Sequence, residues 1–233
     1  MVIAIIPARG GSKRIKNKNI KNFCGKPMIA YALEHAEKAG IFDKIHVSTD
    51  SKEIKSTVES LGYSIDFMRP EYLANDTIGL IPVLNWILSE YSRQGLEYSD
   101  VCCLMPACPL IEPQDLVSGY EIYRTHHGKY PLHVVTGFPV PIEWAYRRDD
   151  SGFLTPVSPG AFAERSQDLE PAYYESGPFS FFHARHILSD DPAADLGFVS
   201  LVLPKYKAVD IDDVEDLQFA ELIYRGRLAQ RAT

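Results

Sequence analysis

Short apolar runs alternate with amphipathic segments along the first 136 residues, and this alternation predicts the fold. The continuous apolar run Val2–Ile6 is typical of a strand that is buried on both faces. Further strands are predicted at Lys44–Ser48, Ile65–Met68, Asp100–Met105 and Pro131–Thr136, with helices over Pro27–Ala36, Ser51–Leu61, Gly79–Tyr91 and Pro113–Arg124. This order predicts an α/β fold, a Rossmann-like and mostly parallel sheet with helices on both faces.

The regular pattern fails between residues 137 and 185, a stretch rich in proline, charge and aromatic side chains. Its aromatic residues are Trp144, Tyr146, Phe153, Phe162, Tyr173, Tyr174, Phe179, Phe181 and Phe182. We expect residues 137–185 to leave the main sheet, within a single domain that spans residues 1–233. Regularity returns with a strand-like segment at Phe198–Leu203, a short strand that ends at Asp210–Asp212, and an amphipathic helix over Val214–Leu228.

Composition and charge narrow the function. The 233 residues are 45% hydrophobic, which is enough for a core, and the net charge of −7 disfavours a general nucleic-acid surface. The first 33 residues carry seven cations and no acid, so the remaining 200 carry −14. Such concentrated cations indicate a specific anionic ligand. No membrane span, signal peptide or CxxC zinc spacing is visible, so we expect a cytoplasmic enzyme without nucleic-acid or membrane partners.

A glycine-rich basic segment, Pro7–Arg14, follows the first predicted strand. Gly10 and Gly11 can turn successive N–H groups toward phosphate oxygens, and Arg9 and Lys13 can add charge-assisted hydrogen bonds. The segment is neither a Walker P-loop nor a GxGxxG motif. We favour a phosphate site over a solvated basic loop, because the cations cluster directly after a predicted strand. A nucleic-acid-binding arm is a third interpretation, which we disfavour because no aromatic residue lies nearby to stack on bases.

The segment Val209–Asp212 alternates apolar and acidic residues. If it is extended, Asp210 and Asp212 project from one face, and paired carboxylates suit Mg²⁺ together with substrate phosphates. Asp212 and Glu215 also fit a capping box that starts the last helix. The spacing alone leaves both interpretations open.

Taken together, the motifs resemble the acylneuraminate cytidylyltransferases, and most of all the pseudaminic acid branch of that family. The resemblance rests on Ile6–Arg14, Lys18–Asn19, Phe23–Tyr31, Val47–Asp50, Arg69–Pro70, Leu73–Ala74, Asp76 and Val209–Asp212, which occur in this order, and on Cys102–Cys103 and Gln167–Tyr174. It implies a nucleotidyltransferase that moves CMP from CTP to the anomeric hydroxyl of a nonulosonic acid and releases pyrophosphate. Pseudaminic acid is the sugar that we expect, with N-acetylneuraminic and legionaminic acid as alternatives.

By the same resemblance, a set of residues is assigned to CTP: Ala8, Arg9, Gly10, Gly11, Ser12, Lys13, Lys18, Asn19, Arg69 and Asp76. Arg9, Lys13, Asp210 and Asp212 are the implied catalytic residues, and Asp210 and Asp212 hold the Mg²⁺ cofactor. Sugar contacts are expected from Met105, Arg165, Gln167 and Tyr173. Family members also imply a homodimer that forms through residues 137–185.

The chain departs from the family pattern at two places near the expected sugar. Sialic-acid members carry a Gln-Pro-Thr-Ser-Pro-type run where this chain has Met105–Pro109, which favours a less hydroxylated, more apolar sugar. Pseudaminic members show Gly-Gln-Phe-Tyr where this chain has Gly177–Ser180. Two other classes of function remain: a nucleotide-sugar-dependent glycosyltransferase and a nucleotide-binding protein without catalytic activity.

Overall fold

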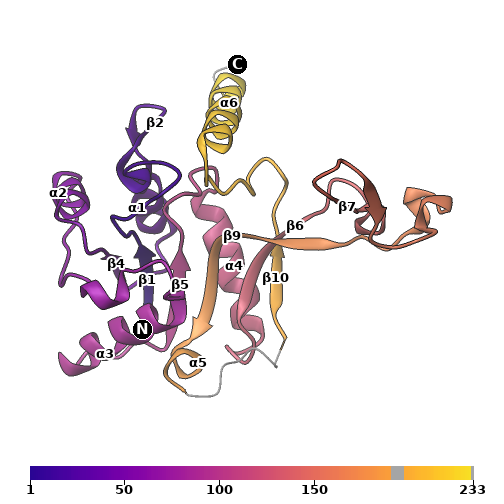
Figure 1. Ribbon diagram of the computed structural model, residues 1–233. Coiled ribbons are helices and arrows are strands. Elements are labelled where there is room, and N and C mark those ends of the chain that lie inside the picture. The colour runs from indigo at the N-terminus through magenta and orange to yellow at the C-terminus, as the bar shows by residue number, and fades with distance from the viewer. Residues whose placement is uncertain (190–196, 232–233) are drawn as a thin grey trace.

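The computed structural model describes residues 1–189 and 197–231, and within them a six-stranded sheet forms the centre of the molecule (Figure 1). The strand order is β10-β6-β9-β5-β1-β4. The strands are β1 (Val2–Pro7), β4 (Lys44–Ser48), β5 (Asp100–Leu104), β6 (Leu132–Gly137), β9 (Tyr173–His183) and β10 (Val199–Val202). All neighbours pair in parallel except β9, which runs antiparallel to both β5 and β6. The predicted, mostly parallel sheet is confirmed.

Helices cover both faces of this sheet, as the sequence predicts. On one face lie α1 (Met28–Ala39), α2 (Lys52–Ser60) and α4 (Pro113–Thr125), whose apolar side chains share a core with alternate residues of the strands. On the other face, α3 (Leu80–Arg93) and α5 (Ala184–Leu188) pack over Ile3, Ile5, Val101 and Cys103. A third cluster joins α6 (Val214–Arg231) to the hairpin of β2 (Asn22–Phe23) and β3 (Lys26–Pro27). None of the described helices is long and apolar enough to cross a membrane.

Local signals start and end these helices close to the predicted residues. Pro27 occupies the N-cap position of α1, where its fixed φ favours the helical entry, and Gly40 ends the helix with a φ of 65°. Ser51 caps α2, since its side chain accepts a hydrogen bond from the amide of Ile54 at 3.4 Å. These elements depend on neighbours in sequence, and their prediction is correct.

The predicted strand at Ile65–Met68 is wrong, because these residues pack through side chains instead of joining the sheet. Phe67 makes ring contacts with His46, Trp86 and Tyr91. The Asp66 carboxylate accepts hydrogen bonds from Lys44 at 2.6 Å and from the Tyr91 hydroxyl at 2.5 Å. The apolar run therefore covers the outer strand β4 and the end of α3.

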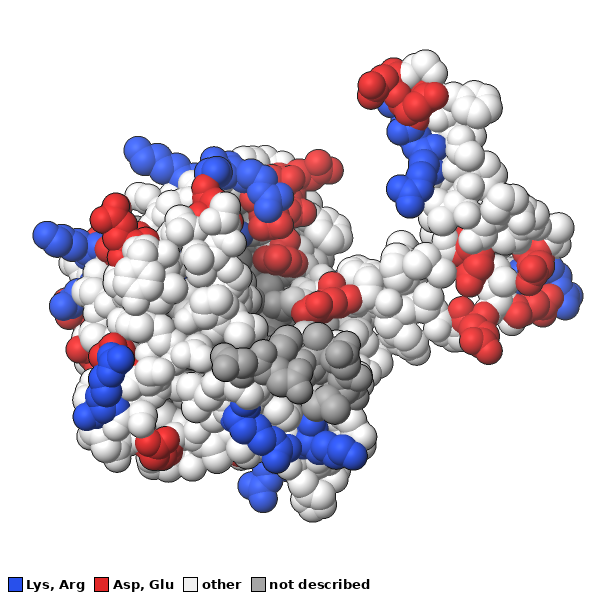
Figure 2. All heavy atoms as spheres, turned by 60° about the horizontal axis from the view of Figure 1, so that its bottom comes forward, with Lys and Arg blue, Asp and Glu red and all other residues white. Residues whose placement is uncertain are grey.

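The expectation that residues 137–185 lie outside the sheet is wrong for their last part. Residues 173–183 form β9, which inserts between β5 and β6, and Phe179 and Phe181 are buried in the core. Residues 138–172, the arm, do leave the sheet and extend away from the body of the molecule (Figures 1 and 2). The arm contains β7 (Tyr146–Arg148), β8 (Leu154–Pro156) and three short 3₁₀ helices, Ile142–Trp144, Ala161–Ala163 and Ser166–Asp168.

The segment that follows β10 is held by side chains and not by strand pairing. β10 agrees with the segment predicted at Phe198–Leu203, whereas the short strand predicted to end at Asp210–Asp212 does not form. Lys207 is buried against the carboxylates of Glu112 at 2.6 Å and Asp115 at 2.9 Å. Burial disfavours the ammonium of Lys207, but these two carboxylates outweigh burial and raise its pKa. This buried ion pair ties the segment to α4 and thereby fixes where Val209–Asp212 lies.

Candidate functional site

Residues 7–19 follow the carboxyl end of β1 and run into the 3₁₀ helix Lys18–Ile20. Gly10 donates its amide to Asp50 Oδ1 at 2.9 Å, and a Cβ on Gly10 would lie 2.9 Å from the Cβ of Ser51. Glycine is therefore required here by close packing. Neither Gly10 nor Gly11 has a positive φ, and the Gly10 amide is already donated. An anion would therefore be bound mainly by the cationic side chains of this loop, and less by its backbone amides.

Four cations of this segment meet two carboxylates from distant parts of the chain. Arg9 lies 2.5 Å from Asp76, whose second oxygen pairs with Lys13. Arg14 and Lys18 pair with Asp212, at 2.7 and 3.2 Å. They surround a cavity of about 400 Å³, the basic cavity, lined by Pro7, Arg9, Ser12, Lys13, Arg14, Ile15, Lys18, Asn19, Met105, Pro106, Ala107 and Asp212.

The same contacts keep both carboxylates ionised. The hydrogen bonds from Lys13 and Arg9 hold the pKa of Asp76 below its usual range. Burial alone would raise the pKa of Asp212, but Lys18 and Arg14 outweigh it and lower the pKa. An anionic ligand with oxygens in these positions could replace either carboxylate without leaving a cation unpaired.

Two predicted nucleotide residues act as supports of the loop. The amide of Ala8 donates to the carbonyl oxygen of Ser48 at 2.9 Å, which extends the pairing of β1 with β4. Asn19 is buried, and its side-chain amide donates to the carbonyl oxygen of Arg9 at 3.0 Å. Both contacts fix the backbone from which Arg9 projects.

Arg69 and Asp76, which were expected near the nucleotide, line a smaller cavity of about 200 Å³. The Arg69 guanidinium is buried and donates to the side-chain and backbone oxygens of Ser48 at 3.0 and 2.8 Å. Burial lowers the pKa of this guanidinium, although Asp50 opposes the effect. Pro7, Arg9 and Met105 line both this cavity and the basic cavity, so the two adjoin.

Asp210 and Asp212 lie on either side of a buried residue. Ile211 is fully buried and its amide donates to the carbonyl oxygen of Ala107 at 3.1 Å, although the segment is not a strand. Asp210 lines the largest of the three cavities described in this section, and Asp212 lines the basic cavity. Burial, and then the charge of Asp212, raises the pKa of Asp210, whose Oδ1 lies 3.8 Å from the thiol of Cys108. Within the described residues, no cluster of three or more His, Cys, Asp or Glu forms a complete metal site.

The capping interpretation of Asp212 is wrong by one position. The helix α6 is capped by Asp213, whose Oδ1 accepts from the amide of Asp216 at 3.0 Å. Asp216 reciprocates and accepts from the amides of Asp212 and Asp213 at 2.9 and 3.1 Å. The carboxylate of Asp212 is thereby free of a capping role and faces the basic cavity.

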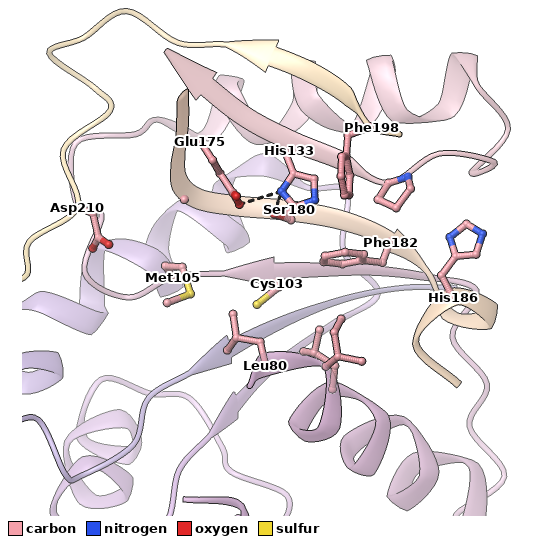
Figure 3. Close-up of a pocket in the computed structure, with 14 residues that line it drawn as sticks. Leu80, Cys103, Met105, His133, Glu175, Ser180, Phe182, His186, Phe198 and Asp210 are labelled. Atoms are coloured by element: carbon pink, nitrogen blue, oxygen red, sulfur yellow. Dashed lines mark hydrogen bonds and ion pairs between the residues drawn. The ribbon is translucent and has the colours of Figure 1, made fainter. Parts of the chain in front are cut away.

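A third, larger cavity of about 470 Å³, the apolar cavity, lies between α3 and the strands β5, β6 and β9 (Figure 3). It is lined by Leu80, Ile81, Leu84, Cys103, Met105, Pro131, His133, Glu175, Gly177, Ser180, Phe182, His186, Phe198 and Asp210. Met105 lines this cavity as well as the other two. Its polar side chains include His133 and Glu175, which sequence reasoning missed; the partners lie 42 residues apart, and no local pattern joins them.

Three of the predicted sugar residues lie elsewhere. Arg165 and Gln167 are exposed on the arm, where Arg165 pairs with Asp168 at 2.7 Å, and Tyr173, the first residue of β9, is 52% exposed. None of them lines the three cavities. Within one chain, Met105 therefore lies near Asp210, Asp212 and the cations of the basic cavity, whereas these three residues do not.

Comparison with known proteins finds related sequences and a similar fold. A family model described as "Cytidylyltransferase" matches residues 3–129. The chain is 34% identical to a pseudaminic acid cytidylyltransferase of Campylobacter jejuni, over 96% of both chains, and 31% identical to a CMP-N,N'-diacetyllegionaminic acid synthase of Legionella pneumophila, over 94% of both. Its fold is similar to that of a CMP:2-keto-3-deoxy-manno-octonic acid synthetase complexed with CTP, with a TM-score of 0.71, 16% identity and coverage of 97% and 99% of the two chains.

Proposed function

The chain belongs to the cytidylyltransferase family, and we propose that it transfers CMP from CTP to the anomeric hydroxyl of pseudaminic acid, releasing pyrophosphate. The observation that carries this proposal is the adjacency of two unlike cavities. One is basic and suits a triphosphate, the other is apolar and suits a deoxygenated sugar, and Met105 lines both. Two substrates held in this way meet at their common wall, where a phosphate and a hydroxyl can be aligned for displacement.

In this proposal, the phosphates of CTP displace two carboxylates from the cations with which they are paired. The triphosphate takes the places at which Asp76 and Asp212 now pair with Arg9, Lys13, Arg14 and Lys18. Charge-assisted hydrogen bonds from these cations neutralise the charge that develops on the phosphates during transfer. The cavity of Arg69 and Asp76 adjoins the basic cavity and takes the cytidine.

Asp210 and Asp212, which line the apolar and the basic cavity, are the residues that would hold a divalent cation. The pKa of Asp210 is raised by burial and by Asp212, so a cation placed between the two carboxylates would relieve their repulsion. Two carboxylates together with phosphate oxygens match the ligands that Mg²⁺ prefers. When bound, Mg²⁺ would act as a Lewis acid on the phosphate and as a template for the two substrates.

We further propose that the protein is a homodimer in which the arm covers its partner. The arm carries apolar side chains that are 43–69% exposed, among them Val140, Ile142, Phe153 and Phe162. Exposed apolar side chains on a projecting segment are typical of an interface. In a dimer, Arg165, Gln167 and Tyr173 can reach the sugar of the partner subunit. Light scattering at micromolar concentration tests the dimer, and a monomer mass would exclude it.

The central experiment measures pyrophosphate release. We expect release to require both CTP and a free nonulosonic acid, and kcat/KM to be highest with pseudaminic acid among the three candidate acids. A glycosyltransferase would instead consume an activated sugar, and a protein that only binds nucleotide would release nothing. A preference for legionaminic or N-acetylneuraminic acid would overturn the choice of sugar and leave cytidylyl transfer in place.

A further inference from the structure

A small polar group lies on one wall of the apolar cavity, opposite α3. His133 on β6 places its Nδ1 atom 2.8 Å from Oε1 of Glu175 on β9, and the Ser180 hydroxyl lies 3.5 Å from the same Nδ1 (Figure 3). The rest of that neighbourhood is apolar, with Phe182 and Phe198 packed on the imidazole at centroid distances of 6.0 and 4.2 Å. A polar pair set into such a wall selects for a matching polar group in the ligand.

A bulge in β9 places Glu175 there. His133 pairs with Ser180, and Val135 pairs with Glu175, so two steps on β6 correspond to five steps on β9. The extra residues turn through Gly177, which has a φ of 67°, and return Glu175 to the cavity face of the sheet. The carbonyl oxygen of Pro178, within the bulge, accepts from the amide of Met105 at 2.9 Å. The position of Glu175 is therefore fixed relative to the shared wall of the cavities.

His133 orients the carboxylate of Glu175 toward a ligand. When the imidazole is neutral, the proton on Nδ1 is donated to Glu175 and Nε2 is left as an acceptor, buried without a hydrogen-bond partner. The Glu175 side chain is 59% exposed, and only its Oε1 bonds to the described residues. Its second oxygen is available to a group that enters the cavity.

The chemistry of this acceptor defines what it recognises. An ionised carboxylate accepts hydrogen bonds and repels other anions, so it excludes the carboxylate of an acidic sugar and attracts an N–H or O–H. The neighbouring walls are formed by Leu80, Ile81 and Phe182, which favour a substituent with an apolar body. An acylamino group combines an N–H donor with a methyl group and meets both requirements.

We propose that Glu175, positioned by His133, is a specificity determinant that accepts a hydrogen bond from an acylamino N–H of the acceptor sugar. This inference rests on the proposed function, because it assigns the apolar cavity to that sugar. Glu175 also lines a smaller cavity of about 290 Å³ together with Asp210, so the acylamino group would lie on the side of the apolar cavity that faces Asp210 (Figure 3).

The test compares sugars and variants together. The sugars are pseudaminic acid and two analogues, each with one acetamido group replaced by hydrogen. For the wild type, we expect kcat/KM to be about 10- to 100-fold lower with the analogue that lacks the acetamido group bound by Glu175 than with pseudaminic acid, as the loss of a charged hydrogen bond predicts. Glu175→Ala should raise KM for pseudaminic acid by a similar factor, leave KM for that analogue unchanged, and leave KM for CTP unchanged.

His133 is tested as a positioning residue. His133→Leu should partly remove the discrimination between pseudaminic acid and the analogue, and His133→Asn, whose amide N–H can replace Nδ1–H, should restore it. Glu121→Gln is the matched control, since Glu121 is exposed on α4 and lines none of the three cavities. Circular dichroism melting curves establish that each variant is folded.

The outcomes separate this inference from the proposed function. If Glu175→Ala keeps the full discrimination, or raises KM equally for all three sugars, the hydrogen bond does not exist and the inference is overturned. In that case pyrophosphate release by the wild type still supports cytidylyl transfer. If the wild type releases no pyrophosphate with any of the acids, the proposed function itself fails, and the inference fails with it.

Discussion

The basic cavity and the apolar cavity share Met105, yet they are built in opposite ways. The basic cavity takes most of its walls from one continuous stretch, Pro7–Asn19, and its cations are held in ion pairs with Asp76 and Asp212. The apolar cavity draws on α3 and three strands that are distant in sequence. One loop can bind a charged ligand, because a few strong contacts suffice. A largely neutral ligand is recognised by the shape of its cavity, and many elements are needed to form that shape.

We expect the largest loss of activity from a substitution of Asp210. Asp210→Asn keeps the shape of the side chain and removes its charge. In the proposed function Asp210 would help to hold Mg²⁺ at the phosphate, so we expect kcat to fall about 100-fold, which corresponds to about 3 kcal/mol of lost stabilisation. Asp213→Asn is the matched control, since Asp213 caps α6 and lines neither cavity. Full activity of Asp210→Asn at limiting Mg²⁺ would remove this residue from the metal site.

Lys13→Ala tests whether the basic cavity binds the nucleotide and not the sugar. Lys13 is exposed and its ion pair with Asp76 links the loop to the rest of the cavity. We expect Kd for CTP to rise about tenfold, with KM for the sugar unchanged. The comparison variant is Lys16→Ala, a neighbouring exposed cation that does not line the cavity. Equal Kd values for the two variants would mean that the loop contributes only general charge.

The same contrast explains how much of the site could be predicted from sequence. Arg9, Lys13 and Lys18 line one cavity, and the sequence can group them because they are close in the chain and follow a recognisable strand. His133 and Glu175 were missed because they come together only through the bulge between β6 and β9. Arg165, Gln167 and Tyr173 were selected by resemblance alone, and their role in a sugar site remains a prediction.

The elements of the fold also differ in whether local sequence determines them. The long strands and α-helices up to residue 136 carry their own start and stop signals, and the sequence predicts them correctly. The strand predicted at Ile65–Met68 is wrong, and the short hairpin of β2 and β3 was not predicted. The strand β9 was hidden in an irregular stretch, because an antiparallel strand placed between β5 and β6 is determined by distant partners. Its Phe179 and Phe181 form part of the core, while Trp144 and Phe162 stack on each other within the arm.

Met105→Gln tests the wall that both cavities share. The glutamine side chain is similar in length, but it adds polar atoms to the apolar cavity, so we expect it to favour a more hydroxylated sugar. The ratio of kcat/KM for N-acetylneuraminic acid to that for pseudaminic acid should rise about fivefold, which corresponds to one hydrogen bond. Met105→Leu, which keeps the wall apolar, should leave the ratio as it is. An unchanged ratio in Met105→Gln would show that the sugar does not contact this residue.

Mild acid should weaken the fold before it affects the basic cavity, whose carboxylates Asp76 and Asp212 have lowered pKa values. His46 is buried, bonds through Nδ1 to the Tyr91 hydroxyl at 2.9 Å, and has its pKa lowered by burial to about 4. Since the unfolded chain takes up this proton near pH 6.5, stability falls as the pH drops below about 7, by about 0.7 kcal/mol between pH 7 and pH 6 for this one residue. The loss continues until the pH reaches the folded pKa. Denaturant unfolding at the two pH values measures it, and His46→Gln, which does not titrate, should reduce the difference by that amount. An identical pH dependence in His46→Gln would show that His46 is not the group that takes up the proton.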